Sequence, residues 1–254
     1  MRLTRLHVAS TLRTGTALAL PDEAGAHVAR VLRARAGDEL VLFNGDGREF
    51  PGVVESVRGV RVTVAVGEGR VVDRESPLAV TLVQSVPRGD RMDLVVQKAT
   101  ELGAARIVPV LSQRSVIRLD AAQAASKAQH WQAVAIAACE QCGRNRLPVV
   151  EAPRPLIQFL GEATGCAARL VLEPETAGGG PVADLSPAGG EVQIAVGPEG
   201  GFAAEELEAF RVAGFARLTL GPRVLRTETA AIAALVWLQI RFGDLGGLAG
   251  ASSG

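Results

Sequence analysis

"AVGPEGGFAAEELEAF", residues Ala195–Phe210, joins an apolar strand to a helix through a glycine-rich turn. Gly197, Gly200 and Gly201 let the chain turn sharply and present backbone amides with no side chain in the way. A phosphate-binding loop would add a lysine and a serine or threonine after its last glycine, whereas this turn carries Glu199. We therefore expect a ligand that is neutral or cationic where it meets the loop. A tight turn that binds nothing is the alternative from this stretch alone.

A second stretch has the same organisation. "LTLGPRVLRTETA", Leu218–Ala230, is again a strand, a glycine turn and the start of a helix. Thr227 is placed to cap that helix, and Glu228 in its first turn interacts favourably with the helix dipole. Two such loops at the ends of neighbouring strands form a crevice at the carboxyl edge of an α/β sheet, where ligands usually bind. The segment 172–175 is expected to supply a third edge.

The sequence on either side of these loops predicts a parallel sheet covered by helices, because short apolar runs alternate with long helical patterns. The expected strands are "LAVTLVQS", "RIVPVL", "RLVLE", "VQIAVG" and "RLTLG". Helices are expected over about 92–102, stopped by Gly103, over 121–141, and over 227–242. The last is apolar on nearly every side, so it should be buried or lie in a subunit interface.

The first seventy or so residues differ, because short β segments are separated by turns such as "NGDG". This pattern predicts a small barrel, interrupted by one helix in "AHVARVLRARAGD" that stops at Gly37. We place the boundary near Glu75. The predicted organisation is a barrel over residues 1–74, an α/β domain over 75–243 and a flexible tail over 244–254.

Composition favours a soluble globular protein, with 48% hydrophobic and 21% charged residues among 254. The longest apolar runs are too short to span a bilayer, and the N-terminus lacks the apolar block of a secretory signal, so a cytoplasmic location is expected. "CEQC", Cys139–Cys142, has no second pair or histidine cluster beside it. It predicts helix packing, with redox or metal chemistry as the alternative, and we expect no metal site.

The net charge of zero conceals a division. Residues 1–150 carry 20 Lys and Arg against 15 Asp and Glu, and residues 151–254 carry 7 against 12. The surplus of five in the first part indicates a basic face for a polyanion, ordinary solvated charge being the alternative.

"GPEGGF" followed by "LGPRVLRTETA" resembles the signature pair of the RsmE family of SPOUT methyltransferases, which methylate N3 of a uridine in 16S ribosomal RNA using S-adenosylmethionine. "HVARVLR", "KATELG" and "EQCGRNRLP" fit the other blocks of that family in the right order. The resemblance implies an N-terminal PUA-like barrel that binds RNA, a trefoil-knotted C-terminal domain and an obligate homodimer with active sites near the subunit interface. It also implies 16S ribosomal RNA, within the small ribosomal subunit, as the substrate.

S-adenosylmethionine suits these loops because its sulfonium is a cation and no phosphate needs neutralising. The resemblance assigns its contacts to Leu172, Gly197, Gly201, Leu220, Leu225, Arg226, Thr227 and Thr229. Gly200 and Glu199 are expected to shape the turn. One departure from the family is Ala203, where members often carry serine or threonine, although Glu206 is in place. The lost helix cap costs about 1 kcal/mol.

Uracil N3 carries a proton at neutral pH, so the enzyme must remove it or stabilise the anion that its loss leaves. An arginine fork suits the diffuse charge on O2 and O4. Our hypothesis is that Arg226, or an arginine from the barrel or the partner subunit, stabilises this anion, with Glu173 as candidate base. The alternative is that Arg226 only pairs with a neighbouring acid.

RNA binding must rest on arginine, because the chain has no tyrosine and only 4% aromatic residues. The candidates are Arg30, Arg33, Arg35, Arg144 and Arg146. Three other functions stay open at this point. They are another SPOUT methyltransferase acting on transfer RNA or on a ribose 2′-hydroxyl, a non-catalytic RNA-binding protein, and a phosphate-handling enzyme, against which the acidic loop argues.

Overall fold

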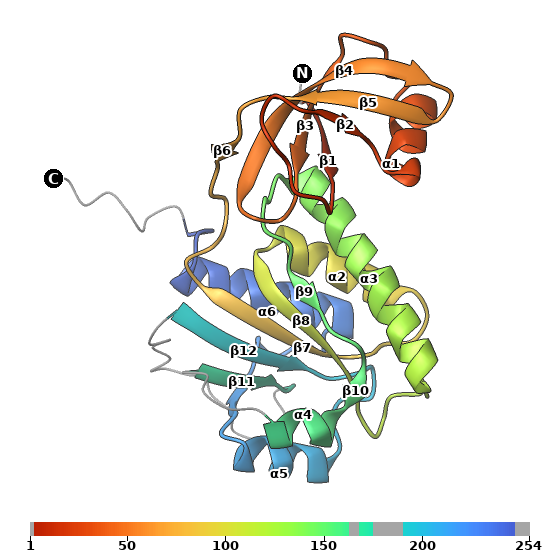
Figure 1. The fold of residues 1–254 in the computed structure, drawn as a ribbon. Helices are drawn as coiled ribbons and strands as arrows, with labels where there is room; N and C mark the ends of the chain where they lie inside the picture. The colour runs from red at the N-terminus through yellow and green to blue at the C-terminus, as the bar shows by residue number, and fades with distance from the viewer. Residues whose placement is uncertain (1–2, 163–167, 175–189, 247–254) are drawn as a thin grey trace, which may run out of the picture. The chain divides into compact units, whose positions relative to one another are not determined.

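The computed structural model describes residues 3–162, 168–174 and 190–246 (Figure 1). Two compact units make up the chain: unit 1 contains residues 1–75 and 139–147, and unit 2 contains residues 76–138 and 148–254. The sequence pattern did not indicate that residues 139–147 group with the first unit. Most of the predicted tail, residues 247–254, lies outside the described residues.

Unit 1 is built on a six-stranded sheet in the order β1-β3-β4-β5-β2, with β6 pairing β4. Its strands are β1 (Thr4–His7), β2 (Ala17–Ala19), β3 (Glu39–Phe43), β4 (Arg48–Arg58), β5 (Arg61–Val66) and β6 (Arg70–Val71). The β1–β3 pair is parallel and the other pairs are antiparallel. Successive side chains of a strand point to opposite faces of the sheet, and one face forms the core. In β5, Val62, Val64 and Val66 are buried while the residues between them are not.

The helix of unit 1 is shorter than the sequence predicted. It consists of α1 (Asp22–Ala26) and the π-helical turn η1 (His27–Val31), and does not continue to Gly37. Arg33 takes a left-handed conformation with φ +53°. The backbone N–H of Ala34 donates to the carbonyl of Val28 at 3.1 Å, which closes the helix end in the manner usual for glycine.

Residues 139–147 are held to the rest of unit 1 by buried polar groups. The Arg5 guanidinium donates to Asn145 Oδ1 at 2.5 Å, and Asn145 Nδ2 donates to the Val72 carbonyl at 2.9 Å. Arg144 Nη2 lies 2.5 Å from Glu75 Oε2. Arg144 and Asn145 on this segment therefore serve the packing of unit 1.

Unit 2 contains a seven-stranded sheet in the order β10-β8-β7-β12-β11-β13, with β9 pairing β8, and every pair is parallel. Its strands are β7 (Ala79–Ser85), β8 (Ala104–Leu111), β9 (Val149–Val150), β10 (Arg154–Pro155), β11 (Ala168–Leu172), β12 (Glu191–Val196) and β13 (Ala216–Leu218). The five predicted strands are confirmed within three residues at each end; the short β9 and β10 were not predicted.

The helices of unit 2 are α2 (Arg91–Glu101), α3 (Ala121–Cys142), α4 (Leu156–Glu162), α5 (Ala204–Val212) and α6 (Thr227–Phe242). The three long helices are confirmed, and α6 has the predicted bounds. None of the helices within the described residues is both long and apolar enough to cross a membrane.

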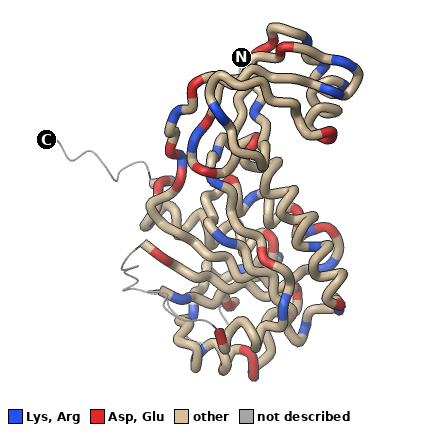
Figure 2. Tube along the Cα trace, in the orientation of Figure 1, with Lys and Arg blue, Asp and Glu red and all other residues tan. Residues whose placement is uncertain are grey.

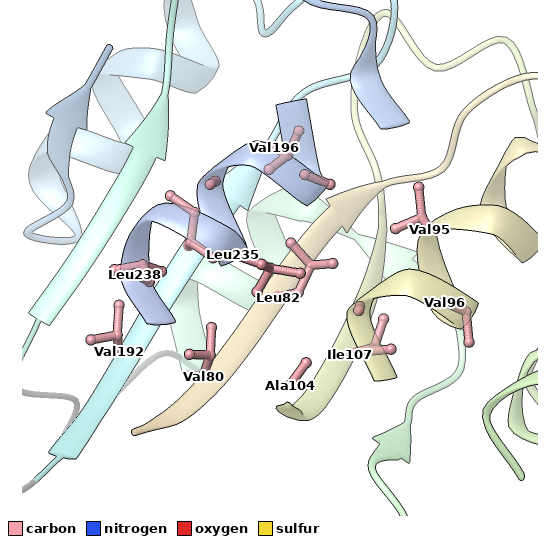
Figure 3. Packing of buried hydrophobic residues seen from close by; sticks show 14 of the residues in the cluster. Val80, Leu82, Val95, Val96, Ala104, Ile107, Val192, Val196, Leu235 and Leu238 are labelled. Carbon is pink, nitrogen blue, oxygen red and sulfur yellow. The ribbon is translucent and has the colours of Figure 1, made fainter. Parts of the chain in front are cut away.

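Both faces of this sheet are buried, which explains its continuous apolar strands. On one face Val80 and Leu82 of β7 pack with Leu235 and Leu238 of α6 (Figure 3). On the other face Val83 belongs to a core shared with α4 and α5. Helices cover the faces, so the carboxyl edge of the sheet is left for loops. The trefoil knot stays a prediction.

Candidate active site

The loops that follow β11, β12 and β13 meet in a pocket at the carboxyl edge of the sheet, because these three strands are parallel neighbours. The space within the pocket is about 590 Å³, part of which is open solvent. Its lining is Leu172, Glu173, Pro174, Val196, Gly197, Pro198, Glu199, Gly201, Leu220, Gly221, Arg223, Val224, Leu225, Thr227 and Ala230.

Six of the eight predicted cofactor residues line this pocket: Leu172, Gly197, Gly201, Leu220, Leu225 and Thr227. Arg226 and Thr229 are exposed and are not among the lining residues. Helical spacing explains Thr229, because Thr227 and Ala230 share the face toward the pocket and Thr229 points elsewhere. The assignment of all eight to a cofactor stays a prediction.

A chain of hydrogen bonds ties two of the loops together. Gln84 Nε2 at the end of β7 donates to Thr227 Oγ1 at 2.9 Å, and Thr227 Oγ1 donates to the Gly197 carbonyl at 2.6 Å. Gln84 is fully buried and Thr227 is 4% exposed. A polar residue inside the apolar run "LVQS" was the one signal that could have identified Gln84.

The predicted cap at Thr227 is wrong. Arg226 is the N-cap residue of α6, makes no side-chain cap bond, and has an extended backbone with φ −65° and ψ 153°. Thr227 is the first helical residue, and its hydroxyl is committed to Gly197 instead. The hydroxyl therefore fixes the glycine loop against α6.

Glu199 shapes the glycine loop through its side chain. Its Oε1 accepts hydrogen bonds from the Arg88 backbone N–H at 3.1 Å and from Arg91 Nη1 at 2.6 Å. Arg114 Nη1 donates to the Gly200 carbonyl at 2.7 Å. The charge of Glu199 is thus balanced by Arg91, a partner that the sequence did not indicate.

We expect ligand binding at this loop to be insensitive to pH between about 7.5 and 5.5. Burial raises the pKa of Glu199, but the backbone N–H groups of Glu199 and Arg88 and the charge of Arg91 together hold that pKa below its ordinary value. A lowered pKa in the folded state means that the stabilisation is complete above the ordinary value of about 4.3 and is lost only as the pH falls through the folded pKa.

Calorimetric titration with S-adenosylmethionine across this pH range checks the expectation. Glu199→Gln should bind about 3- to 10-fold more weakly at every pH, because a charge-assisted bond becomes a neutral one. A wild-type affinity that fell between pH 7.5 and 5.5 would contradict the lowered pKa.

Ala203 is the N-cap residue of α5 and makes no side-chain cap bond. The other half of the capping arrangement is kept, since Glu206 Oε2 accepts from the Ala203 N–H at 2.9 Å. Glu206 is 2% exposed, and its Oε1 accepts from the Gln113 N–H at 2.7 Å. The glutamate therefore holds the start of α5 to the loop after β8, in addition to its half of the cap.

The two catalytic candidates differ in their place relative to the pocket, since Glu173 is a lining residue and Arg226 is not. Glu173 lines the pocket, with its Oε1 3.2 Å from Arg217 Nε. Arg226 lies between two lining residues, and within the part of the chain that the structure describes its guanidinium forms no ion pair. Both roles of Arg226, stabilising the anion and pairing with a neighbouring acid, stay predictions.

The RNA candidates of unit 1 divide into two groups. Arg30, Arg33, Arg35 and Arg146 are exposed, and Arg30 belongs to the π-helical turn η1, a feature common at functional sites. Arg144 is 5% exposed and ion-paired with Glu75. Its predicted role is corrected, because its guanidinium is used inside unit 1.

The structure favours the packing interpretation of "CEQC". Cys139 is fully buried, and a hydrogen bond with Cys142 together with burial raises the pKa of its thiol, which makes the reactive thiolate scarce. Among the described residues no group of three or more His, Cys, Asp or Glu could hold a metal ion.

Comparisons with known proteins match both parts of the chain. The RNA methyltransferase domain family matches residues 74–239, and the RNA methyltransferase PUA domain family matches residues 20–65. The ribosomal RNA small subunit methyltransferase E of Bacillus subtilis is 34% identical over 82% of this chain and 84% of its own length. The protein of that name from Mycobacterium tuberculosis is 36% identical over 87% and 86%.

Solved structures agree with these matches. A putative methyltransferase from Legionella pneumophila, in complex with the bound cofactor SAM, has a TM-score of 0.89 at 42% identity and covers 96% of this chain and 100% of its own. A ribosomal RNA small subunit methyltransferase E from Neisseria gonorrhoeae, bound to S-adenosyl methionine, has a TM-score of 0.88 at 35% identity, with coverage of 96% and 100%.

Proposed function

Because the chain belongs to the RNA methyltransferase family of the ribosomal RNA small subunit methyltransferases E, we propose that it methylates N3 of a uridine in 16S ribosomal RNA, using S-adenosylmethionine. The observation that carries this proposal is the pocket at the carboxyl edge of unit 2, where six residues expected to contact that cofactor come together. The similar chains from Legionella pneumophila and Neisseria gonorrhoeae have the cofactor bound.

The pocket residues fit the cofactor. Leu172, Leu220 and Leu225 give the pocket apolar walls, and the glycine loop offers backbone groups instead of a phosphate-binding lysine. A Cβ atom at Gly197 would lie 3.3 Å from backbone atoms of Gly201 and Phe202. This part of the loop is therefore closed tightly on itself, and a side chain at position 197 would have to displace backbone.

S-adenosylmethionine supplies, when bound, a methyl group on a sulfonium centre. The residues of this chain provide position and charge for the acceptor base. We assign to Glu173 the acceptance of the N3 proton of the uracil, from its place in the pocket lining. Arg226 then donates hydrogen bonds to the negative charge that spreads onto O2 and O4.

A homodimer within the cytoplasm, acting on the small ribosomal subunit, completes the proposal. Ile240 of α6 is 54% exposed and Leu245, just after the helix, is 49% exposed. These apolar side chains support an interface between two copies on that side of unit 2.

The deciding experiment incubates the protein with labelled S-adenosylmethionine and small ribosomal subunits from a strain lacking it. Mass spectrometry of the labelled RNA should place the methyl group on N3 of one uridine of 16S ribosomal RNA. Label found only in transfer RNA, or on a ribose 2′-oxygen, would transfer the assignment to another SPOUT activity. A protein that binds no S-adenosylmethionine in calorimetry would be a non-catalytic RNA-binding protein.

Unit 1 should contribute to RNA affinity through Arg30 and Arg33. The double variant Arg30→Gln, Arg33→Gly should bind single-stranded RNA more weakly and reduce the slope of log affinity against log salt by about 1.4, since each lost phosphate contact removes about 0.7. Glycine is chosen at position 33 because the φ of +53° suits it. Fluorescence anisotropy over a salt series measures both quantities.

The matched control is Arg58→Gln, Arg61→Gln, which removes two exposed arginines from another part of unit 1. Binding of S-adenosylmethionine should be the same in both variants. If the control changed the salt slope as much as the test pair did, Arg30 and Arg33 would have no special place in the interface.

A further inference from the structure

Unit 2 carries 14 Lys and Arg against 16 Asp and Glu, so its net charge is −2. A polyanion can approach such a unit only where basic side chains gather without acidic partners. Six of the 14 form ion pairs within the described residues. The remaining eight, which form none within residues 76–138, 148–162, 168–174 and 190–246, are Arg88, Arg114, Arg118, Lys127, Arg169, Arg223, Arg226 and Arg241.

Five of these eight lie in loops at one edge of the sheet. Arg88 follows β7, Arg114 and Arg118 follow β8, and Arg223 and Arg226 follow β13. Since all the strands of this sheet are parallel, these loops lie at the carboxyl edge, together with the pocket. Figure 2 shows the Lys and Arg residues in blue along the chain. The unpaired arginines are thus concentrated where the proposed reaction takes place.

Contacts place three of these arginines at the glycine loop or the pocket. Arg114 Nη1 donates to the Gly200 carbonyl at 2.7 Å, and the Arg88 backbone N–H donates to Glu199 at 3.1 Å. Arg223 is part of the pocket lining. Arg88, Arg114, Arg118 and Arg223 are all exposed. The four side chains therefore face solvent on loops of the edge that carries the pocket.

Several acidic groups at this edge are engaged by other partners than these five arginines. Glu199 is paired with Arg91, and Glu173 lies 3.2 Å from Arg217. Glu206 is buried, and its carboxylate accepts hydrogen bonds from two backbone N–H groups. Four further acids stand at this edge without an ion pair among the described residues: Asp90 before α2, Asp120 before α3, Glu205 in the first turn of α5 and Glu228 in the first turn of α6. The five arginines form no ion pair with any of them, so their guanidinium groups are left for an external anion.

We propose that Arg88, Arg114, Arg118 and Arg223 form a surface on unit 2 that binds the sugar–phosphate backbone of RNA on either side of the nucleotide entering the pocket. This rests on the proposed function, because it takes that nucleotide to be part of a ribosomal RNA. Guanidinium groups match phosphate oxygens in two-point geometry. Aromatic stacking contributes little, since the chain has no tyrosine, two tryptophans and seven phenylalanines. The RNA backbone, with its dense phosphate charge, is the partner that such a surface fits.

The test uses the full-length double variant Arg88→Gln, Arg118→Gln. Neither side chain belongs to the pocket lining or bonds to the glycine loop, whereas Arg114 does, so cofactor binding should be kept. The probe is a labelled single-stranded RNA of about 20 nucleotides containing uridine, titrated by fluorescence anisotropy over a salt series. Its affinity should fall about tenfold or more, and the salt slope should decrease by about 1.4.

The matched control is Arg169→Gln, Arg241→Gln. It removes the same charge from unit 2. Arg169 is the second residue of β11 and Arg241 is next to the last residue of α6, so both lie away from the carboxyl ends of the strands. RNA affinity and salt slope should stay close to wild type. Calorimetry with S-adenosylmethionine and the unfolding temperature should be unchanged in the test variant.

The proposal is overturned if Arg88→Gln, Arg118→Gln keeps the wild-type RNA affinity and slope, or if the control pair loses as much. Methyl transfer decides the proposed function separately. A wild-type protein that labels no small-subunit RNA would defeat that function whatever the binding result, while normal labelling with unchanged RNA binding in the variant would defeat the arginine surface alone.

Discussion

Replacing Arg226 with alanine should lower the rate of methyl transfer by about 10²- to 10³-fold, the loss that follows removal of one donor from a developing anion. Arg226 stands between Leu225 and Thr227, which both line the pocket. Its guanidinium is exposed and forms no ion pair within the described residues. The side chain is therefore free to turn toward a bound uracil, and its fork can donate to an oxygen on either side of N3.

Single-turnover measurements at saturating S-adenosylmethionine and RNA isolate this effect from binding. The free energy of unfolding should change by less than about 0.5 kcal/mol, because Arg226 is exposed and makes no side-chain cap bond. Arg226→Lys is the matched control, since it keeps the charge but loses the fork, and should recover only part of the rate. Full turnover in Arg226→Ala would mean that the stabilising arginine comes from unit 1 or the partner subunit.

Local signals in the sequence were sufficient for the framework of unit 2. Apolar runs of strand length mark β7, β8, β11 and β12 because both faces of the sheet are buried, and α6 is recognised by its apolar surface. Neither β9 nor β10 was predicted, because each has two residues and depends on pairing with β8, which no local pattern records.

The limits of sequence reasoning appear most clearly at contacts between distant residues. Arg144 reads as a surface arginine in "CGRNRLP", yet Glu75, 69 positions earlier, binds it inside unit 1. Glu199 reads as a free acid in its loop, yet Arg91, 108 positions earlier, pairs with it. Charge in a linear sequence does not reveal whether its partner is solvent, a ligand or another side chain.

Position within a loop was easier to predict than the direction of each side chain. The resemblance selected Thr227 and Thr229 in the first turn of α6, but the helix turns by about 100° per residue, so the two do not face the same side. Thr227 lies toward the pocket and Thr229 does not. The hydroxyl of Thr227 acts through Gly197, a contact that capping rules alone would not have suggested.

Thr227→Val should raise the dissociation constant for S-adenosylmethionine by about 10- to 100-fold, the equivalent of about 1.4–2.7 kcal/mol. Valine keeps the shape of threonine but removes the hydroxyl that joins Gln84 to the Gly197 carbonyl. The Gly197 carbonyl then loses its side-chain donor in a region where Thr227 is 4% exposed. The glycine loop is no longer fixed to α6, so the bound ligand must order it at a cost in affinity.

Thr227→Ser is the matched control, because it keeps the hydroxyl and removes only a methyl group; its affinity should stay within about threefold of wild type. Gln84→Leu should weaken binding less than Thr227→Val, since the threonine can still donate to Gly197 after the amide is gone. Isothermal titration calorimetry on the three variants orders these effects. Equal affinity in Thr227→Val and Thr227→Ser would show that the hydroxyl chain does not hold the loop, and that backbone geometry alone shapes the pocket.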